Sequence, residues 1–97
     1  MATFENKDEA VRVGKGLLNE HMIACYNLWP VDSSYWWKDE LVEQQEFVML
    51  MKSKIRWFDD ICDYIKENTG SETPEVIAFD SEKVDHKYQA WLNDEVK

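Results

Sequence analysis

Residues Cys25 to Lys52 read CYNLWPVDSSYWWKDELVEQQEFVMLMK, and this stretch decides the fold. Its first part, Cys25–Trp37, is rich in aromatic and β-branched residues, and its last part, Glu46–Lys52, is a dense apolar run; both patterns favour β-strands. The polar residues Lys38-Asp39-Glu40 predict a tight turn between them. The stretch therefore predicts a long β-hairpin. Pro30 must lie at a bend, a bulge or a sheet edge, because it cannot donate a ladder hydrogen bond.

A helix is predicted on the N-terminal side of this hairpin, from Asp8 to Ala24. Apolar residues recur there at spacings of three and four, which is typical of a helix with one buried stripe. Asn6 stands where an N-cap residue is favoured. Gly14 and Gly16 weaken the helix, so we expect them to allow close packing on a sheet.

A second helix is predicted after the hairpin. Ser53 is expected to cap it, and its apolar residues again fall on one side: Ile55, Phe58, Ile61, Cys62 and Ile65. Gly70 can adopt the left-handed conformation that ends a helix. Pro74 then opens a short predicted strand, Glu75–Phe79, and a short amphipathic helix carries Val84, Tyr88, Trp91 and Leu92. This last helix is too short to be stable alone and must dock on something.

The order of these elements predicts an α+β protein, a ferredoxin-like split β-α-β sandwich with a long central hairpin and a C-terminal helix. That topology needs a central strand before the first helix, and only Ala2-Thr3-Phe4 is available for it. The first strand is therefore expected to be very short or missing, unless the natural chain begins upstream of Met1. Residues 1–97 contain no linker-like composition, so a single domain is expected.

Composition narrows the classes of partner. The chain has 20 acidic and 11 basic residues and a formal net charge of −9, which argues against nucleic acid and anionic membranes as partners. Two cysteines are too few for a disulfide framework, and no secretory signal is recognisable, so a cytoplasmic location is expected. Five Trp, four Tyr and four Phe residues are a large apolar load for 97 residues. We expect part of it to be buried against other subunits.

Four segments, taken together, resemble the CutA family of divalent-cation-tolerance proteins: Ala24–Pro30, Ser34–Trp37, Thr73–Ala78 and Tyr88–Leu92. The resemblance covers nearly the whole chain from Asp8 onward. It implies a ferredoxin-like protomer in a tight homotrimer, whose long hairpins extend the sheets of neighbouring subunits. It also implies a non-enzymatic role in divalent metal ion tolerance, with copper or zinc as the only suggested cofactor and a further protein partner left unidentified.

Three departures from the family pattern matter. The hairpin turn lacks the usual Gly, which predicts another turn type or a strained Asp39. The first strand is short. Phe4 stands where some copper-binding members have Cys, and Asn68–Glu72 replaces a stretch that often contains His-Pro-Tyr. The family's metal ligands are therefore not carried over, and no metal-ligating residue is assigned.

The remaining chemistry-bearing residues have simple interpretations. Cys25 and Cys62 are expected to be small buried hydrophobes, and His21 and His86 to lie at helix ends in water. No nucleophile motif or phosphate-binding glycine loop is present, and the first strand–helix junction, Phe4–Asp8, is acidic rather than anion-binding. These features predict no enzyme activity, and they speak against an esterase or a phosphatase.

One aromatic group remains open to two interpretations: Tyr35, Trp36, Trp37, Tyr88 and Trp91, together with Lys52 and Glu75. They could line a small-molecule cleft between subunits, since ligand pockets are mostly apolar with a few polar groups. The simpler interpretation, which we favour, is that they form core and trimer contacts. The cleft would suit an alternative function, a PII-like trimeric regulator that senses a small molecule.

Overall fold

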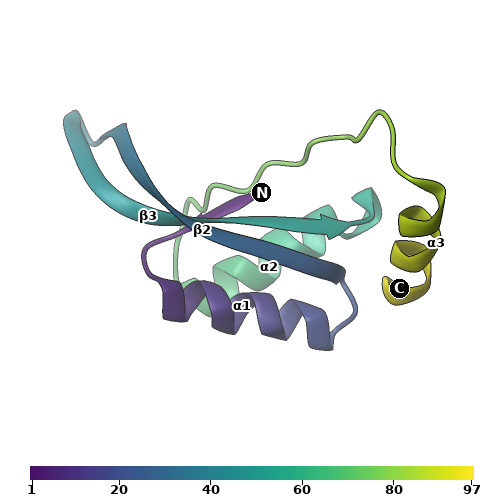
Figure 1. Ribbon diagram of the computed structural model, residues 1–97. Coiled ribbons are helices and arrows are strands. Elements are labelled where there is room, and N and C mark those ends of the chain that lie inside the picture. Colours follow the sequence, from purple (N-terminus) through teal and green to yellow (C-terminus); the bar gives the residue numbers. More distant parts are fainter.

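The computed structural model describes residues 1–97 and is built on a three-stranded antiparallel sheet in the order β1-β3-β2 (Figure 1). The strands are β1 (Ala2–Phe4), β2 (Ile23–Trp37) and β3 (Glu40–Ser53). β2 and β3 form the predicted hairpin, which pairs from Ile23 opposite Ser53 to Trp37 opposite Glu40. β2 is an edge strand, so Pro30 at its centre lies where the sequence requires it.

Two helices cover one face of this sheet: α1 (Lys7–Asn19) and α2 (Phe58–Thr69), which follows a 3₁₀ turn η1 (Ile55–Trp57) (Figure 1). The predicted N-cap of α1 is confirmed, because Asn6 Oδ1 accepts a hydrogen bond of 2.8 Å from the N–H of Glu9. Gly70 ends α2 at φ 70°, also as predicted. α1 ends five residues earlier than expected, where the chain turns into β2.

The prediction that Ser53 caps the second helix is wrong. Lys54 and Trp57 occupy the N-cap positions of η1 and α2, and neither makes a side-chain capping bond. The Ser53 hydroxyl instead donates to the carbonyl of Met22, which ties the end of β3 to the start of β2 at 2.5 Å. The intervening 3₁₀ turn displaces the start of α2 away from Ser53.

The core lies between the sheet and these two helices. Its largest fully buried side chains are Val13, Leu17, Ile23, Met49 and Ile65. Gly14 packs on the sheet as expected, since a Cβ there would lie 2.7 Å from Tyr26 Cε2. Gly16 does not: a Cβ at this position would meet the Tyr64 hydroxyl, so this glycine allows α2, rather than the sheet, to approach α1.

The first strand exists but has only three residues. β1 pairs with Phe47–Met49 of β3 and, on its other side, forms an isolated bridge from Ala2 to Val76. The predicted strand Glu75–Phe79 is therefore wrong beyond Val76, although the N–H of Ile77 donates to the carbonyl of residue 1 at 2.9 Å. A partner strand of three residues offers too few backbone groups to sustain a longer ladder.

The C-terminal helix α3 (His86–Glu95) lies at the far end of the sheet from the hairpin turn (Figure 1). Leu92 and Val96 are buried there, and Lys54 Nζ donates to the carbonyl of Val96 at 2.9 Å. The expectation that this short helix docks on the rest of the chain is confirmed. None of the helices has the length and apolar character needed to cross a membrane.

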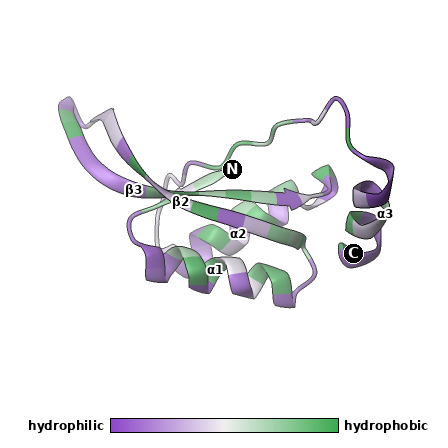
Figure 2. Cartoon of the chain, viewed as in Figure 1, coloured by the Kyte–Doolittle hydropathy of each residue, from purple (hydrophilic) through white to green (hydrophobic).

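The hairpin turn has the strained backbone that the sequence predicts. Lys38 and Asp39 both have positive φ angles, 50° and 64°, and this pair of conformations belongs to a type I′ turn, where Asn-Gly is usually found. The outer part of the hairpin extends well beyond the helices (Figure 1). It carries hydrophobic as well as hydrophilic residues (Figure 2).

The chain is more extended than a free globular protein of its size. Its radius of gyration is 14.3 Å, whereas 97 residues usually give about 12.5 Å. Its accessible surface is 6953 Å², whereas a folded monomer of this mass exposes about 5,800 Å². Only 13 of the 97 residues are buried, so much of the apolar composition lies on the surface of the single chain.

Candidate ligand cavity

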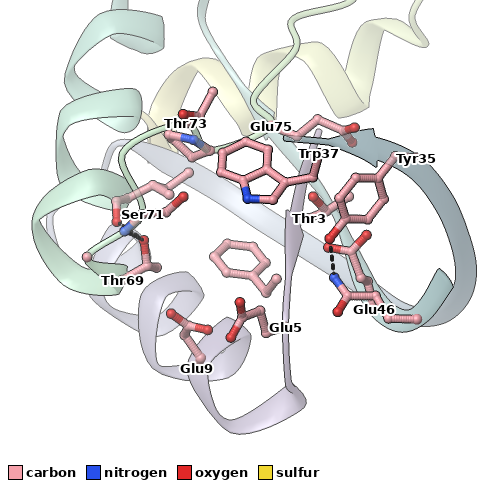
Figure 3. Close-up of a pocket in the computed structure, with 15 residues that line it drawn as sticks. Thr3, Glu5, Glu9, Tyr35, Trp37, Glu46, Thr69, Ser71, Thr73 and Glu75 are labelled. Carbon is pink, nitrogen blue, oxygen red and sulfur yellow. Dashed lines mark hydrogen bonds between the residues drawn. The ribbon is translucent and has the colours of Figure 1, made fainter. Parts of the chain in front are cut away.

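A cavity of about 540 Å³ opens between the outer hairpin, the start of α1 and the loop after α2 (Figure 3). Three aromatic residues and four glutamates are among the residues that line it. The aromatic residues are Phe4, Tyr35 and Trp37, and the glutamates are Glu5, Glu9, Glu46 and Glu75.

Different elements bring these side chains together. Phe4 ends β1 and is 3% exposed, while Glu9 belongs to the first turn of α1, whose start is fixed by the Asn6 cap. Trp37 ends β2 at the hairpin turn. The curvature of the hairpin places the Trp37 indole across the cavity from the carboxylates of Glu5 and Glu9 (Figure 3).

Hydrogen bonds fix two walls of the cavity. Gln44 Nε2 donates to the Tyr35 hydroxyl at 2.6 Å, which joins the two strands of the hairpin through their side chains. Thr69 Oγ1 donates to the carbonyl of Ile65 at 2.7 Å and accepts from the N–H of Ser71 at 3.2 Å. The loop that follows α2 is therefore held against the cavity.

The lining carries negative charge only, since it includes no Lys, Arg or His. Near this wall, burial lowers the pKa of the Met1 amino group, and the carboxylate of Glu75 opposes the shift. The cavity consequently attracts cations and repels phosphate and carboxylate groups.

No group of three or more His, Cys, Asp or Glu side chains is placed to hold a metal ion. Copper and zinc need N, S or O donors at about 2.0–2.3 Å from one point. The four glutamates surround a large space instead of converging. A single chain thus offers no ligand set for the copper or zinc that the family resemblance suggests.

The residues selected from the sequence fall into two groups in the single chain. Tyr35, Trp37 and Glu75 line the cavity. Trp36, their neighbour, does not; its side chain is 73% exposed.

The second group lies around α3, at the other end of the sheet. Lys52 Nζ donates to Asn27 Oδ1, and the rings of Tyr88 and Trp91 pack with centroids 5.4 Å apart. The Tyr88 hydroxyl is 3.4 Å from Cys25 Sγ, and this hydrogen bond, followed by burial, raises the pKa of Tyr88. Within one chain the two groups therefore lie apart, and the predicted cleft between subunits stays a prediction.

Sequence reasoning selected Glu75 but missed the other three glutamates of the cavity, Glu5, Glu9 and Glu46. The junction Phe4–Asp8 was recognisable as acidic, and this excluded a phosphate loop. Its acidity is also the signal that could have located a cation-attracting wall. Glu46 had no such signal, because only the curvature of the hairpin brings it to the same cavity as Glu9.

The fold and the cavity define an α+β protein of the ferredoxin-like class with one long, protruding hairpin. The sequence of residues 1–95 matches the family described as CutA1 divalent ion tolerance protein. The chain belongs to this family.

Relatives agree with this assignment over nearly their full length. The divalent-cation tolerance protein CutA of Thermotoga maritima is 30% identical over 95 residues, which span 98% of this chain and 94% of the relative. The corresponding protein of Pyrococcus horikoshii is 33% identical over 95 residues, which span 98% and 93% of the two chains.

Solved structures agree as well. The structure of the periplasmic divalent cation tolerance protein CutA from Archaeoglobus fulgidus superposes with a TM-score of 0.95 at 28% identity, and covers 99% of this chain and 94% of that one. CutA1 from P. horikoshii gives a TM-score of 0.92 at 33% identity, with 99% and 94% coverage. The predicted family and fold are confirmed.

Proposed function

We propose that this chain acts as a non-enzymatic homotrimer in divalent cation tolerance. Membership of the CutA1 family supports the cation tolerance. The observation that supports the assembly is the exposed surface of the single chain, which exceeds that of a free protein of this mass by about 1,100 Å².

The surface of the single chain carries large exposed apolar side chains and a free sheet edge. Large side chains along the hairpin are exposed: Trp29, Tyr35, Trp36, Trp37 and Leu41. β2 pairs only with β3, so the outer edge of a 15-residue strand has unpaired backbone groups. Such an edge promotes pairing with another chain. A trimer in which each hairpin extends the sheet of a neighbour would cover both features.

The same assembly would unite the two groups of predicted site residues. Tyr35, Trp37 and Glu75 lie toward the turn end of the hairpin. Lys52, Tyr88 and Trp91 lie near its other end, beside α3. A head-to-tail contact joins opposite ends of successive subunits, and it closes into a three-membered ring when each subunit is rotated by about 120° from the one before. We therefore retain a cleft between subunits as part of the proposal, with these six residues and Trp36 around it.

The proposed role in cation tolerance does not require a preformed set of metal ligands within one chain. A net charge of −9 on each chain concentrates divalent cations near the surface, and copper or zinc is favoured only by the family name. The two cysteines are free, which favours a cytoplasmic location; the A. fulgidus relative is described as periplasmic. None of the relatives described above is a PII-like regulator.

Sedimentation and light scattering of the purified protein, with and without a chelator, test the proposal. A trimer that persists over a wide range of dilution is expected, because most of its surface contact is apolar. A monomer at every concentration contradicts it.

A thermal-shift series with Cu²⁺, Zn²⁺ and a nucleotide then tests the role. A saturable rise in melting temperature with a metal at micromolar concentration indicates a site formed between subunits. A rise in melting temperature with the nucleotide alone instead favours the alternative function, a PII-like regulator that senses a small molecule. Fractionation of the producing cells tests the location.

A further inference from the structure

We propose that a groove beside the unpaired end of β3 binds the apolar C-terminal tail of another polypeptide as an added β-strand. The groove has a volume of about 410 Å³ and lies between β3, η1, the start of α2 and the segment Val76–Ser81. None of the residues of the proposed cleft between subunits lines it. This inference goes beyond divalent cation tolerance and does not rest on it. Free backbone groups, apolar walls and one charge support it.

One side of the groove is an unpaired stretch of β3. β1 pairs with β3 only at Phe47–Met49, so Leu50–Ser53 have no neighbouring strand on that side of the sheet (Figure 1). The N–H of Thr3 donates away from β3, to the carbonyl of Glu75. Because successive residues of a strand bond to opposite neighbours, the backbone groups of Met51 face the groove. An added strand of about four residues, or about 13 Å, would pair with this edge.

The other side of the groove is the segment that leads to α3. The N–H of Ile77 donates to the carbonyl of Met1 at 2.9 Å, and the amino group of Met1 donates to the carbonyl of Ile77 at 2.8 Å. Beyond this pair, Ala78–Val84 make no backbone–backbone hydrogen bond. A strand that continues the line of β1 can therefore find partners on both sides, whereas the outer edge of β2 offers a partner on one side only.

The walls of the groove select an apolar strand. Phe58 and Ile61 line it on the side of the helices. On its rim, Ile55 and Phe79 are 78% and 70% exposed. A strand that is covered by apolar groups on both faces is a continuous apolar run rather than an alternating one. Burial of such a run against these four side chains would remove apolar surface of both molecules from water.

The direction of β1 determines which end of the tail meets the fold. A strand in line with β1 runs antiparallel to β3, so its C-terminus lies next to the amino group of Met1. Burial lowers the pKa of this amino group, and Glu75, which does not line the groove, opposes the shift. A terminal carboxylate would pair with the amino group at this partly buried position. The charged side chains that line the groove are Lys54 and Asp80, one of each sign.

The tail of a different polypeptide fits the groove better than a second copy of this chain. The groove has the same chain on both sides and admits one strand, whereas the hairpin of a second copy brings two strands joined at Lys38 and Asp39. The C-terminus of this chain is already bound within its own fold. Val96 is 2% exposed, and the N–H of Lys97 donates to the carbonyl of His21 at 3.0 Å.

Two peptides that differ only at their C-terminus test the proposal. Acetyl-Lys-Lys-Ser-Gly-Val-Ile-Val-Val is added to the ¹⁵N-labelled full chain, either as the free acid or as the C-terminal amide. At saturation, the acid should slow hydrogen exchange of the Met51 amide about tenfold, because this amide gains a partner. The Leu28 amide, on the outer edge of β2, should change less than about twofold. The amide peptide should bind about fivefold more weakly than the acid. Protection of Leu28 instead of Met51, or equal binding of the two peptides, would overturn the proposal.

Two substitutions in the segment before α3 provide the matched comparison. Phe79→Asp places a charge on the rim of the groove and should weaken binding of the acid peptide about tenfold. Val84 is exposed and does not line the groove, so Val84→Asp should change binding less than about twofold. Equal effects of the two substitutions would contradict a tail bound in this groove.

A third variant fills the groove from within the chain. Val-Ile-Val-Val fused before Met1 continues β1 into the groove, so it should raise the melting temperature and abolish binding of the peptide. An extended chain that binds the peptide as tightly as the original chain would show that the peptide lies elsewhere.

The oligomeric state should be measured in the same samples, so that the two proposals fail separately. A monomer that binds the acid peptide saturably refutes the trimer and supports the groove. A trimer whose Met51 amide does not respond to the peptide refutes the groove and leaves the assembly intact. Protection of Met51 that rises with protein concentration in the absence of peptide would mean that a second copy fills the groove, which also refutes the proposal.

Discussion

The two ends of the hairpin are built from one continuous pair of strands, yet their surroundings are opposite. Near Ile23 and Met49, α1 and α2 cover the sheet, and these two side chains are 1% and 0% exposed. Near the turn, Trp36 and Leu41 are 73% and 55% exposed. The covered end is stabilised by its own chain, whereas the outer end retains an apolar surface and a free strand edge. This difference is the basis for the proposal that another subunit completes the outer end.

The covered end should show the largest response to substitution. Leu17 is fully buried in the core, so Leu17→Ala should lower the free energy of unfolding by about 3 kcal/mol, through lost burial and the cavity that remains. Urea unfolding monitored by circular dichroism measures the loss. Leu41→Ala removes the same atoms from the outer hairpin and serves as the control.

The control also sharpens the comparison. In an isolated chain, Leu41→Ala should cost less than about 0.5 kcal/mol, because the side chain is exposed. In an assembly, its cost should grow as the protein concentration rises. Equal losses for Leu17→Ala and Leu41→Ala at every dilution would show that the two ends do not differ as proposed.

The outer end should respond in its association instead. Trp36→Asp places a charge in the proposed contact and should weaken association by about 2 kcal/mol per contact, while the helices keep their far-ultraviolet signal. Light scattering should report a lower mass than for the unmodified protein. An unchanged mass would mean that Trp36 faces solvent in the assembly too.

The sequence predicted the elements that depend on local patterns. The hairpin, the Asn6 cap and the left-handed Gly70 follow from residue types at fixed spacings, and the structure confirms each. The start of α2 was misplaced, because the signal for a capping Ser53 is local whereas a 3₁₀ turn of three residues intervenes. The strand after Pro74 was overextended because its length depends on its partner β1.

The candidate site could be predicted only in part. Aromatic residues on alternate positions of a strand, such as Tyr35 and Trp37, share a face, and both line the cavity. The contribution of Glu9 and Glu46 depends on the curvature of the hairpin toward α1, which no local pattern encodes. The other predicted residues are Trp36, Lys52, Tyr88 and Trp91. Only the proposed contacts between chains could bring them to the same cleft, and a single sequence does not encode the geometry of those contacts.

Backbone strain offers a finer test at the end of α2. Gly70 has φ 70°, and a Cβ there would meet no atom within 4 Å. Gly70→Ala should therefore lower the free energy of unfolding by about 1 kcal/mol through backbone conformation alone. Gly70→Asn should cost less, because Asn tolerates this conformation better. Equal losses in urea unfolding would argue against the conformational cause.

The same physics predicts the opposite sign at the outer end. Asp39 has φ 64° in the type I′ turn, so Asp39→Gly should raise the free energy of unfolding by about 0.5 kcal/mol. Asp39→Ala keeps a Cβ and loses the polar side chain, so it should not stabilise. A loss of stability with Asp39→Gly, measured by thermal unfolding, would indicate that the turn changes conformation when the hairpin meets its partner.

The smallest expected effect concerns Tyr88, where α3 meets the start of β2. The hydrogen bond to Cys25, and then burial, raises the pKa of the phenol above its ordinary value of 10.0. The protonated phenol is thus favoured in the folded state, so its contribution to stability is complete below pH 10 and is lost as the pH rises through the folded-state pKa. Tyr88→Phe should remove this part of the alkaline loss of stability. Cys25→Ala should return the phenol titration, followed by ultraviolet absorbance, toward its ordinary range. Identical alkaline slopes for all three proteins would show that the contact is broken in solution, which would leave α3 held by Lys54 and by its buried Leu92 and Val96.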